Sequence, residues 1–357
     1  MSEQRSRRAF LAAVGAVGLA GLAGCGGTGG DATGGASGAE VSSTGASSTE
    51  RAASGAADAL TVFHAGSLGA AFDDLEAAYT AAHDVSVTQE SGGSVRSTKK
   101  VTQPPHRSAD VLAVADYRLL RDGLLPEYGD WYALFATNAM TVAYTDESAY
   151  ADAFTPENWW NVLARDDVAV GHSDPAVDPN GYRALMSMAL GATPFEGEAL
   201  YDDATAEAMR ENATVPASDE VDLLSQLHSG KLDYAWSYRS FGASHDVRTI
   251  DLQPEVDLSR ATEAYAEHYA TVSVDAGDTT YTGGPIAYGI SVPSTAAHSA
   301  RGADYVAFAL GEGARVLREN GFDVLDTAVV PAAHADAVPE PVAAHAEARE
   351  SLGPLAL

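Results

Sequence analysis

The fold is decided by residues 59–94, which read ALTVFHAGSLGAAFDDLEAAYTAAHDVSVTQESGGS. A β-rich run at 59–65 is broken by Gly66-Ser67, and apolar residues then recur at helical spacing over 68–82. Residues 85–89 alternate as a strand does and are broken in turn by the Gly-Gly-Ser at the end of the stretch. A strand followed by a helix, twice in succession, predicts parallel strands joined by crossover helices.

Strand-like and helix-like stretches continue to alternate along the rest of the chain. About 300 residues follow position 58, which is more than one simple core holds and suits two lobes. We therefore expect an α/β protein of two lobes, each a mostly parallel sheet flanked by helices. Further strands are expected at 109–115, 139–144, 168–172, 232–236 and 286–292, and helices at 95–102, 182–190, 221–227, 300–310 and 313–320.

The first 25 residues are typical of an export signal. Arg7-Arg8 matches the arginine pair of a twin-arginine signal, and a short apolar run follows and ends at Leu22-Ala23-Gly24-Cys25, which resembles a lipobox. A membrane span needs about 20 strongly apolar residues, so an unprocessed N-terminal anchor is the weaker alternative. Cys25 is the only cysteine, which excludes an intrachain disulfide. We expect lipidation of Cys25 and a membrane-anchored protein on the outer face of the cell membrane.

The segment 26–58 consists mainly of Gly, Ser, Thr and Ala and has no hydrophobic periodicity. Such a segment cannot bury enough apolar surface to order itself, so we expect a disordered tether.

The chain is strongly acidic, with 50 Asp and Glu against 21 Lys and Arg and a formal net charge of −29. Binding to nucleic acid rests on cationic contacts with phosphate, so this balance argues against a nucleic-acid partner. It suits the solvated surface of a halophile, because molar salt screens the repulsion between like charges.

The same local motif occurs twice: a strand is followed by Gly-Ser and then by a helix. We call each of these turns a corner. They are Gly66-Ser67 and Gly93-Ser94. Glycine lets the backbone approach a ligand, the helix start presents unpaired N–H groups, and serine adds a hydroxyl, so such a corner can hold an anion. Serine is also a common helix N-cap, so either corner alone is explained without a ligand. Two corners in successive β–α units would face the same crevice.

Six short blocks carry a resemblance to a known family: FHAGSL at 63–68, GSV at 93–95, AVADY at 113–117, DPNGYR at 178–183, LDYAWSYRS at 232–240 and GPIAYG at 284–289. Taken together, the blocks resemble archaeal tungstate/molybdate-binding lipoproteins of the ModA/WtpA type, haloarchaeal forms included. They stand in the family's order and together cover nearly all of residues 59–330. The resemblance implies a periplasmic-binding-protein fold of type II that closes on its ligand like a clamp. It also implies a monomer without a cofactor that delivers its anion to an ABC permease and its ATPase.

The resemblance also implies which residues contact the ligand. Hexavalent tungsten and molybdenum accept more than four oxygens, so Asp178 and Glu220 would approach the metal at the centre of the oxyanion. Sulfate and phosphate cannot expand in this way, and their oxygens would meet the carboxylates without compensation. The implied contacts are Gly66, Ser67, Ser94, Asp178, Pro179, Asn180, Glu220 and Tyr238.

The residues themselves leave other interpretations of this set open. Asp178 lies in Asp-Pro-Asn-Gly, a turn sequence that needs no ligand. Glu220 stands near an expected helix start, where acids are favoured. Tyr238 suits a core tyrosine with a satisfied hydroxyl.

The sequence departs from the family pattern at two positions. Asn180 stands where cysteine is usual, and Ser237 stands where glutamate is usual and removes an acid near the site. Arg96, Arg183 and Arg239 lie beside the motifs and receive no role.

The expected lobes are residues 59–137 plus 285–357, and residues 138–284. Paired crossings near 137–139 and 283–285 would form a hinge. The serine corners would lie on one lobe and the acids with Tyr238 on the other, so the ligand would bridge them.

Two other functions remain open, a binding protein for another oxyanion such as sulfate or phosphate, and a secreted serine hydrolase. The segments around Ser67 and Ser94 each lack one glycine of the G-x-S-x-G elbow, and His64 is expected to point into the sheet. The histidines show neither H-x-H nor H-E-x-x-H spacing. We predict a binding protein and not an enzyme.

Overall fold

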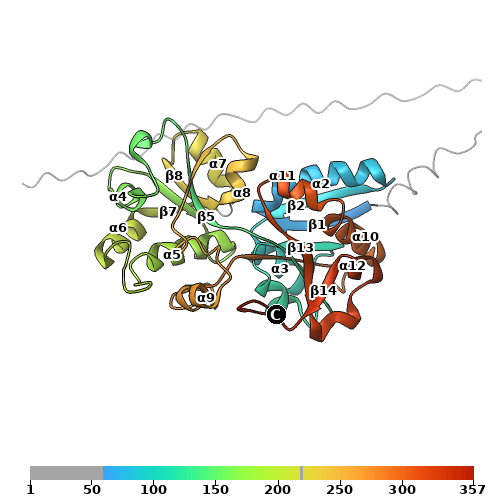
Figure 1. Cartoon of the computed structure of the whole chain (residues 1–357). Coiled ribbons are helices and arrows are strands. Elements are labelled where there is room, and N and C mark those ends of the chain that lie inside the picture. The colour runs from blue at the N-terminus through green and yellow to red at the C-terminus, as the bar shows by residue number, and fades with distance from the viewer. Residues whose placement is uncertain (1–58, 218–219) are drawn as a thin grey trace, which may run out of the picture. The chain divides into compact units, whose positions relative to one another are not determined.

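The computed structural model describes residues 59–217 and 220–357 (Figure 1). The expected export signal at 1–25, with Cys25, and the expected tether at 26–58 lie outside these residues. Within the two described ranges, no helix is both long and apolar enough to cross a membrane.

Two sheets organise the described chain. We call the part built on the seven-stranded sheet the first lobe and the part built on the five-stranded sheet the second lobe. The first sheet has the order β14 (Ala346–Arg349), β13 (Asp323–Pro331), β4 (Ala133–Thr137), β12 (Ala287–Ser291), β3 (Val111–Val114), β1 (Ala59–Ala65) and β2 (Ser86–Gly92). The second has the order β7 (Ala213–Ala217), β6 (Val170–Ser173), β8 (Tyr234–Tyr238), β5 (Met140–Tyr144) and β9 (Arg248–Asp251).

The strand directions correct the expectation of mostly parallel sheets. The β1–β2 and β1–β3 pairs are parallel as predicted, but β12 is antiparallel to both β3 and β4. In the second lobe, β6 is parallel to β7 and β8, whereas β5 is antiparallel to β8 and β9. The reason is that β4, β5 and β12 carry the chain between lobes, so their direction follows the crossings and not a βαβ unit.

Helices cover both faces of each sheet. Along β3, Val111 and Ala113 pack with α2 (Gly69–Ala82), α10 (Ser299–Leu310) and α11 (Ala314–Glu319). The alternate residues Leu112 and Val114 pack on the other face with α3 (Ser94–Thr102) and the turn η2 (Leu119–Leu124). Successive strand residues point to opposite faces, which is why a strand buried on both sides reads as continuously apolar. Figure 1 shows α2 and α3 on opposite sides of this sheet.

The second lobe follows the same plan. One face of its sheet packs against α4 (Trp159–Leu163), α5 (Pro179–Leu190) and α6 (Asp203–Asn212). The other face packs against α7 (Glu220–His228) and α8 (Arg239–Ser244) through Leu223, Leu227 and Phe241. The remaining elements are α9 (Glu263–Tyr269), α12 (Glu340–Ala343), the hairpin β10 (Ser273–Ala276) and β11 (Thr279–Thr282), the pair β15 (Ser351–Leu352) and β16 (Leu355–Ala356), and the short turns η1 (Gly66–Leu68), η3 (Ala151–Ala153) and η4 (Ala332–Ala337).

The chain crosses between the sheets after β4 and again before β12, and one segment braces both crossings. Met140 N–H donates to the carbonyl of Asp257 at 2.7 Å, and Ile286 N–H donates to the carbonyl of Leu258 at 2.9 Å. Leu258 has a φ of 59°, which is uncommon for a residue other than glycine. Residues 257–258 therefore hydrogen-bond to both crossing strands.

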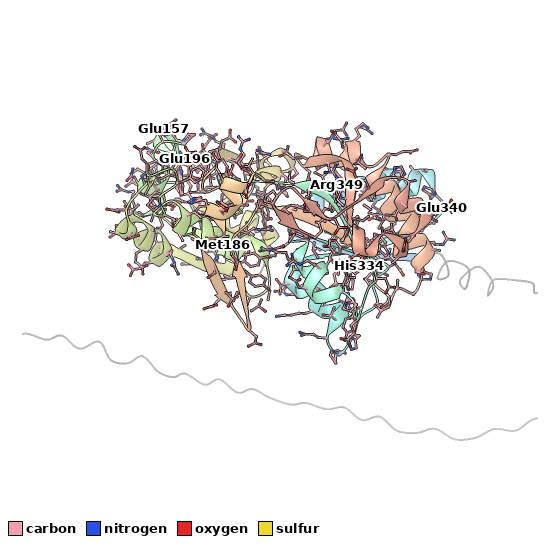
Figure 2. The ribbon with its side chains drawn as sticks, turned by 60° about the horizontal axis from the view of Figure 1, so that its bottom comes forward. Glu157, Met186, Glu196, His334, Glu340 and Arg349 are labelled. Atoms are coloured by element: carbon pink, nitrogen blue, oxygen red, sulfur yellow. The ribbon has the colours of Figure 1, made fainter. Side chains whose placement is uncertain are left out.

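Acidic side chains of the described residues stand both at the surface and in buried positions such as Asp116 and Glu220. Glu157, Glu196 and Glu340 are all exposed, as Figure 2 shows. Met186 on α5, in contrast, is buried against Val95 and Tyr182.

Candidate functional site

The two Gly-Ser corners stand at the same edge of the first sheet. Strands β1 and β2 are parallel, and their last residues, Ala65 and Gly92, are partners in the register. Gly66 and Ser67 therefore begin the turn η1 next to the point where Ser94 begins α3. The carboxyl edge of parallel strands is where α/β proteins place their ligands.

Ser67 is joined to a distant tyrosine. Its Oγ lies 2.9 Å from Oη of Tyr288 on β12, and either hydroxyl can be the donor. Asn138, in the first crossing, donates from Nδ2 to the same Tyr288 oxygen at 3.4 Å and to Ser240 Oγ at 2.8 Å. This bonding ties the Ser67 corner to both crossings of the chain.

Ser94 is completely buried, and its hydroxyl has a partner in the same lobe. Its Oγ accepts a hydrogen bond from the backbone N–H of Ala115 at 3.0 Å. A serine hydroxyl that accepts from an amide still has its own proton to donate. Ser94 can therefore donate to an anion at the start of α3.

The Asp178-Pro179-Asn180 turn begins α5 of the second lobe. Asp178 is the helix N-cap, its Oδ1 accepting from Asn180 N–H at 3.3 Å, and Pro179 occupies the first helical position, where proline is favoured. The Asn180 side chain donates to the carbonyl of Trp236 at 3.1 Å and accepts from Ser173 Oγ at 3.2 Å. The Asn180 side chain thus joins β6 to β8, and its backbone N–H serves the Asp178 cap.

Glu220 is the first described residue of α7 and is buried. Its Oε1 accepts from Tyr238 N–H at 3.1 Å and from the hydroxyl of Ser237. Ser237, which the resemblance marked as a departure, therefore supplies a hydrogen-bond donor to this carboxylate. Helix α7 also contacts the turn η1, which brings Glu220 to the side of Ser67.

Tyr238 ends β8 and is completely buried. Its ring lies 6.1 Å from that of Tyr288 at an angle of 69°, and its Oη accepts from Nη1 of Arg183 at 2.8 Å. Burial is the largest influence on its pKa and raises it well above the usual range, so the phenol stays protonated at neutral pH.

The Gly93-Ser94 corner of the first lobe touches the Asp178 turn of the second. A Cβ built on Gly93 would lie 2.3 Å from the carbonyl oxygen of Val177 and 3.1 Å from Cβ of Asp178. Arg96 N–H donates to the same carbonyl at 3.2 Å. Only glycine allows this approach. The contacts of Gly93 and Arg96 with residues 177–178, and of α7 with η1, bring parts of the predicted set together across the two lobes.

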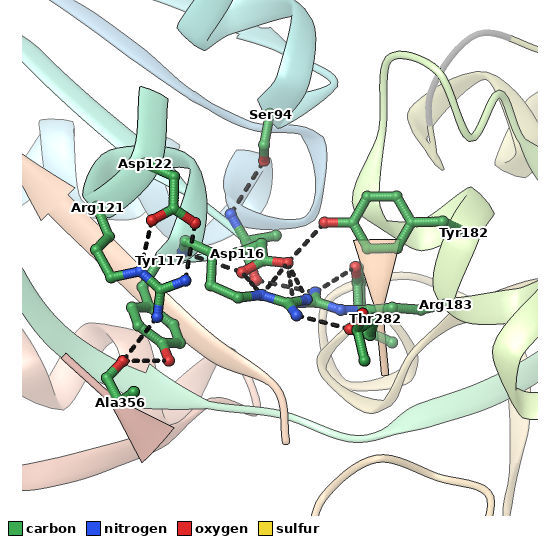
Figure 3. A network of polar contacts seen from close by, with 12 residues as sticks. Ser94, Asp116, Tyr117, Arg121, Asp122, Tyr182, Arg183, Thr282 and Ala356 are labelled. Atoms are coloured by element: carbon green, nitrogen blue, oxygen red, sulfur yellow. Dashed lines mark hydrogen bonds and ion pairs between the residues drawn. The ribbon is translucent and has the colours of Figure 1, made fainter. Parts of the chain in front are cut away.

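Sequence reasoning gave no role to Arg183, yet this residue lies at the centre of the arrangement. It is 2% exposed and donates from Nη1 to the carbonyl of Ala115 at 2.9 Å, and its Nη2 lies 3.5 Å from Oδ2 of Asp116 (Figure 3). Asp116 also bonds Arg118 and accepts from Tyr182 Oη at 2.7 Å. The spacing of Asn180 and Arg183, three residues apart on one helix face, was the signal available in the sequence.

The charges in this network stabilise one another. Burial by itself would raise the pKa of Asp116, but Arg118 and Arg183 hold that pKa well below its usual value. Burial would lower the pKa of Arg183, whereas Tyr238 and Asp116 raise it. Asp116, Arg118 and Arg183 are therefore all charged at neutral pH, and the second lobe contributes a buried cation, Arg183, beside the predicted residues.

His64 has the structural role that the sequence predicted. It is buried, its Nδ1 lies 2.9 Å from the carbonyl of Ala65, and its ring packs 5.0 Å from that of Phe72. Burial lowers its pKa. Because the Ser67 hydroxyl is bonded to Tyr288 and not to His64, the pair does not form a nucleophile and base in this arrangement.

Two α/β lobes that bring polar groups together at their meeting edges define the class of two-lobed ligand-binding proteins. The model of the family described as bacterial extracellular solute-binding protein matches residues 60–323, and the chain belongs to that family. The prediction of an extracytoplasmic binding protein and not an enzyme is confirmed at this level, because the family consists of solute-binding transport proteins.

Several curated proteins are similar over most of their length. An uncharacterized solute-binding protein of Methanoculleus marisnigri is 38% identical over 307 residues, covering 79% of this chain and 84% of the relative. The molybdate/tungstate-binding protein WtpA of Thermococcus kodakarensis is 36% identical over 319 residues, covering 82% and 88%. WtpA of Pyrococcus abyssi is 34% identical over 294 residues, covering 74% and 84%.

Solved structures share the fold at low sequence identity. The sulfate-binding protein SubI of Mycobacterium tuberculosis aligns with a TM-score of 0.53 and 15% identity, covering 81% of this chain and 94% of SubI. The periplasmic molybdate-binding protein of Azotobacter vinelandii aligns with a TM-score of 0.50 and 16% identity, covering 74% and 98%. The predicted two-lobed α/β binding-protein fold is confirmed.

Proposed function

We propose that this protein captures tungstate or molybdate outside the cell and delivers it to an ABC permease driven by its ATPase. In this proposal the protein is a monomer of a halophile, is exported by the twin-arginine route and is held at the outer face of the membrane by a lipid on Cys25. Two relatives that carry the name molybdate/tungstate-binding protein support the choice of ligand.

The observation that carries the proposal is the meeting of hydroxyl donors and acids from opposite lobes. Ser67 and Ser94 stand at the carboxyl edge of the first sheet, and Glu220 and Asp178 begin helices of the second lobe. The close approach of Gly93 to the Asp178 turn and the contact of α7 with η1 bring the two sets together. Helix starts and hydroxyls supply hydrogen bonds to the oxygens of an anion.

The two carboxylates give the proposed selectivity. Glu220 is buried and already fixed in orientation by the amide of Tyr238 and the hydroxyl of Ser237. A hexavalent metal accepts additional oxygen ligands, so a carboxylate can approach the metal and not only its oxygens. Sulfate and phosphate offer no such site, and a carboxylate beside them costs free energy by repulsion.

Closure of the lobes would then follow from the ligand. We assign the hinge to the crossings at 137–139 and 283–285, which are braced by residues 257–258. An anion that touches groups of both lobes binds the closed form better than the open form and shifts the population toward it. A permease can recognise that closed form.

The test is calorimetry and thermal melting on anion-stripped protein with tungstate, molybdate, sulfate and phosphate. A ligand at a hundredfold excess over its Kd stabilises the folded state by about 2.7 kcal/mol, so the two metal oxyanions should raise Tm and the other two should not. Glu220→Gln should lower the affinity for tungstate roughly 10- to 100-fold, because it removes a charged contact.

Glu157→Gln is the matched control, because it makes the same chemical change at an exposed position. It should bind as the unsubstituted protein does. Equal stabilisation by sulfate or phosphate, undiminished in Glu220→Gln, would establish a different oxyanion as the ligand. No heat with any of the four anions would refute the proposed function.

A further inference from the structure

Arg183 is a buried cation that connects the two lobes. Its guanidinium donates from Nη1 both to the carbonyl of Ala115, at the end of β3 in the first lobe, and to Oη of Tyr238 in the second. It forms an ion pair at 3.5 Å with Asp116, a carboxylate that is 1% exposed and is shared with Arg118 (Figure 3). Burying an arginine costs several kcal/mol unless its charge is paired and its donors are used, so this placement requires an explanation.

The hydrogen bonds of the Tyr238 hydroxyl explain why Arg183 is buried here. A phenol has a single proton to donate, and its oxygen here accepts from Arg183. The guanidinium has no acceptor, so the Tyr238 proton must be directed to a different group. The backbone N–H of Tyr238 donates to Glu220 Oε1 at 3.1 Å, so this tyrosine stands beside one acid of the proposed site.

The same guanidinium also fixes the donor of the opposite lobe. The Ala115 carbonyl accepts from Arg183, and the Ala115 N–H donates to Ser94 Oγ at 3.0 Å. One residue therefore joins Arg183 to Ser94. With its oxygen occupied as an acceptor, the Ser94 hydroxyl is left, like that of Tyr238, to donate its proton.

We propose that Arg183 is a positioning residue that makes the hydroxyls of Tyr238 and Ser94, from opposite lobes, simultaneous donors to the bound oxyanion. This rests on the proposed function and deepens it. When the lobes meet, Arg183 reaches the carbonyl of Ala115, and the two donors acquire their orientation in the same step. An oxyanion, which only accepts, is then favoured over a solute that must itself donate at this place.

A double-mutant cycle tests this coupling. Arg183→Lys and Arg183→Gln are each made in the full chain and in the Tyr238→Phe background, and tungstate and molybdate affinities are measured by calorimetry on anion-stripped protein. Lysine keeps the charge beside Asp116 but not the planar fork that serves two acceptors, so that variant is expected to fold even where glutamine fails. Tm without ligand checks folding.

We expect each Arg183 substitution to lower affinity about 10-fold when Tyr238 is present and less than about 3-fold when Tyr238→Phe has removed the hydroxyl. If substituting Arg183 lowers the affinity by the same factor with and without the Tyr238 hydroxyl, the inference is overturned, because Arg183 would then act on the fold alone. The proposed ligand would be unaffected by that result. Full affinity in Arg183→Lys would also overturn it, since charge would suffice. No heat in the unsubstituted protein would refute the proposed ligand itself, and the inference with it.

Discussion

The close approach of the two lobes at Gly93 leads to a specific prediction for Gly93→Ala. The added Cβ would lie 2.3 Å from the Val177 carbonyl oxygen and 2.9 Å from its carbon. Both are backbone atoms, so rotation of a side chain cannot relieve the clash. Because Gly93 and Val177 belong to different lobes, separating the lobes relieves it. The cost therefore falls on the closed, ligand-holding form.

The magnitude follows from the cost of overpacking, which is typically about 1–3 kcal/mol. If that cost is confined to the closed form, the affinity for tungstate should fall roughly 5- to 150-fold. The Tm of ligand-free protein should change little, because the open form avoids the contact. The ligand-induced rise in Tm should shrink accordingly.

Gly92→Ala is the control, one residue away. A Cβ at Gly92 would meet only Ser97 Oγ, at an ordinary 3.9 Å, within the first lobe. Calorimetry should find near-normal affinity in this variant. Equal affinities in the two variants would refute the reasoning, because the Gly93 corner would not meet the Asp178 turn when ligand is bound. If Gly93→Ala lowers the Tm of the ligand-free protein as well as the affinity, the clash is present in both the open and the closed form.

Two further predictions concern Asp257 and Ser237. Burial raises the pKa of Asp257 to about 6. The pKa of the Asp257 carboxyl is higher in the folded state than in the unfolded chain. The protonated carboxyl therefore stabilises the folded state, and this stabilisation, about 3 kcal/mol, is lost as pH rises from about 4 to about 6. Asp257→Asn should therefore raise Tm at pH 7 and flatten the Tm profile between pH 4 and 6, and an unchanged profile would refute the assignment. Ser237→Ala removes the hydroxyl that donates to Glu220 and should weaken tungstate binding roughly 10-fold by calorimetry, whereas unaltered binding would show that this bond does not orient the carboxylate.

Local sequence patterns determined the elements and the corners of this protein. The run at 59–65 and the helical spacing over 68–82 became β1, η1 and α2, because hydrophobic period and glycine placement act over a few residues. The expected strands and helices are all present, with ends shifted by a few residues. Strands β4, β7, β9, β13 and β14 of the two main sheets were not anticipated, and β7, β9 and β14 among them are edge strands.

The resemblance of short blocks to a known family named the candidate residues, but it could not say how they touch. Ser67 and Tyr288 lie 221 positions apart, and their hydrogen bond exists only because β12 returns into the first sheet. The bond of Asn180 to Trp236 likewise depends on β6 pairing with β8, and the bond of Ser237 to Glu220 depends on α7 packing against β8.

The sequence by itself determined that this is an acidic α/β protein with serine corners suited to an anion, since charge, period and turn chemistry are local properties. The tertiary structure decided the direction of β12, the contact of Gly93 with Val177 and the burial of Arg183 beside Asp116. These depend on which distant segments meet. From the sequence alone, a charged side chain beside a motif can be either exposed to water or paired with an opposite charge. Only the fold decides, because excluding water from the side chain requires that its charge be paired.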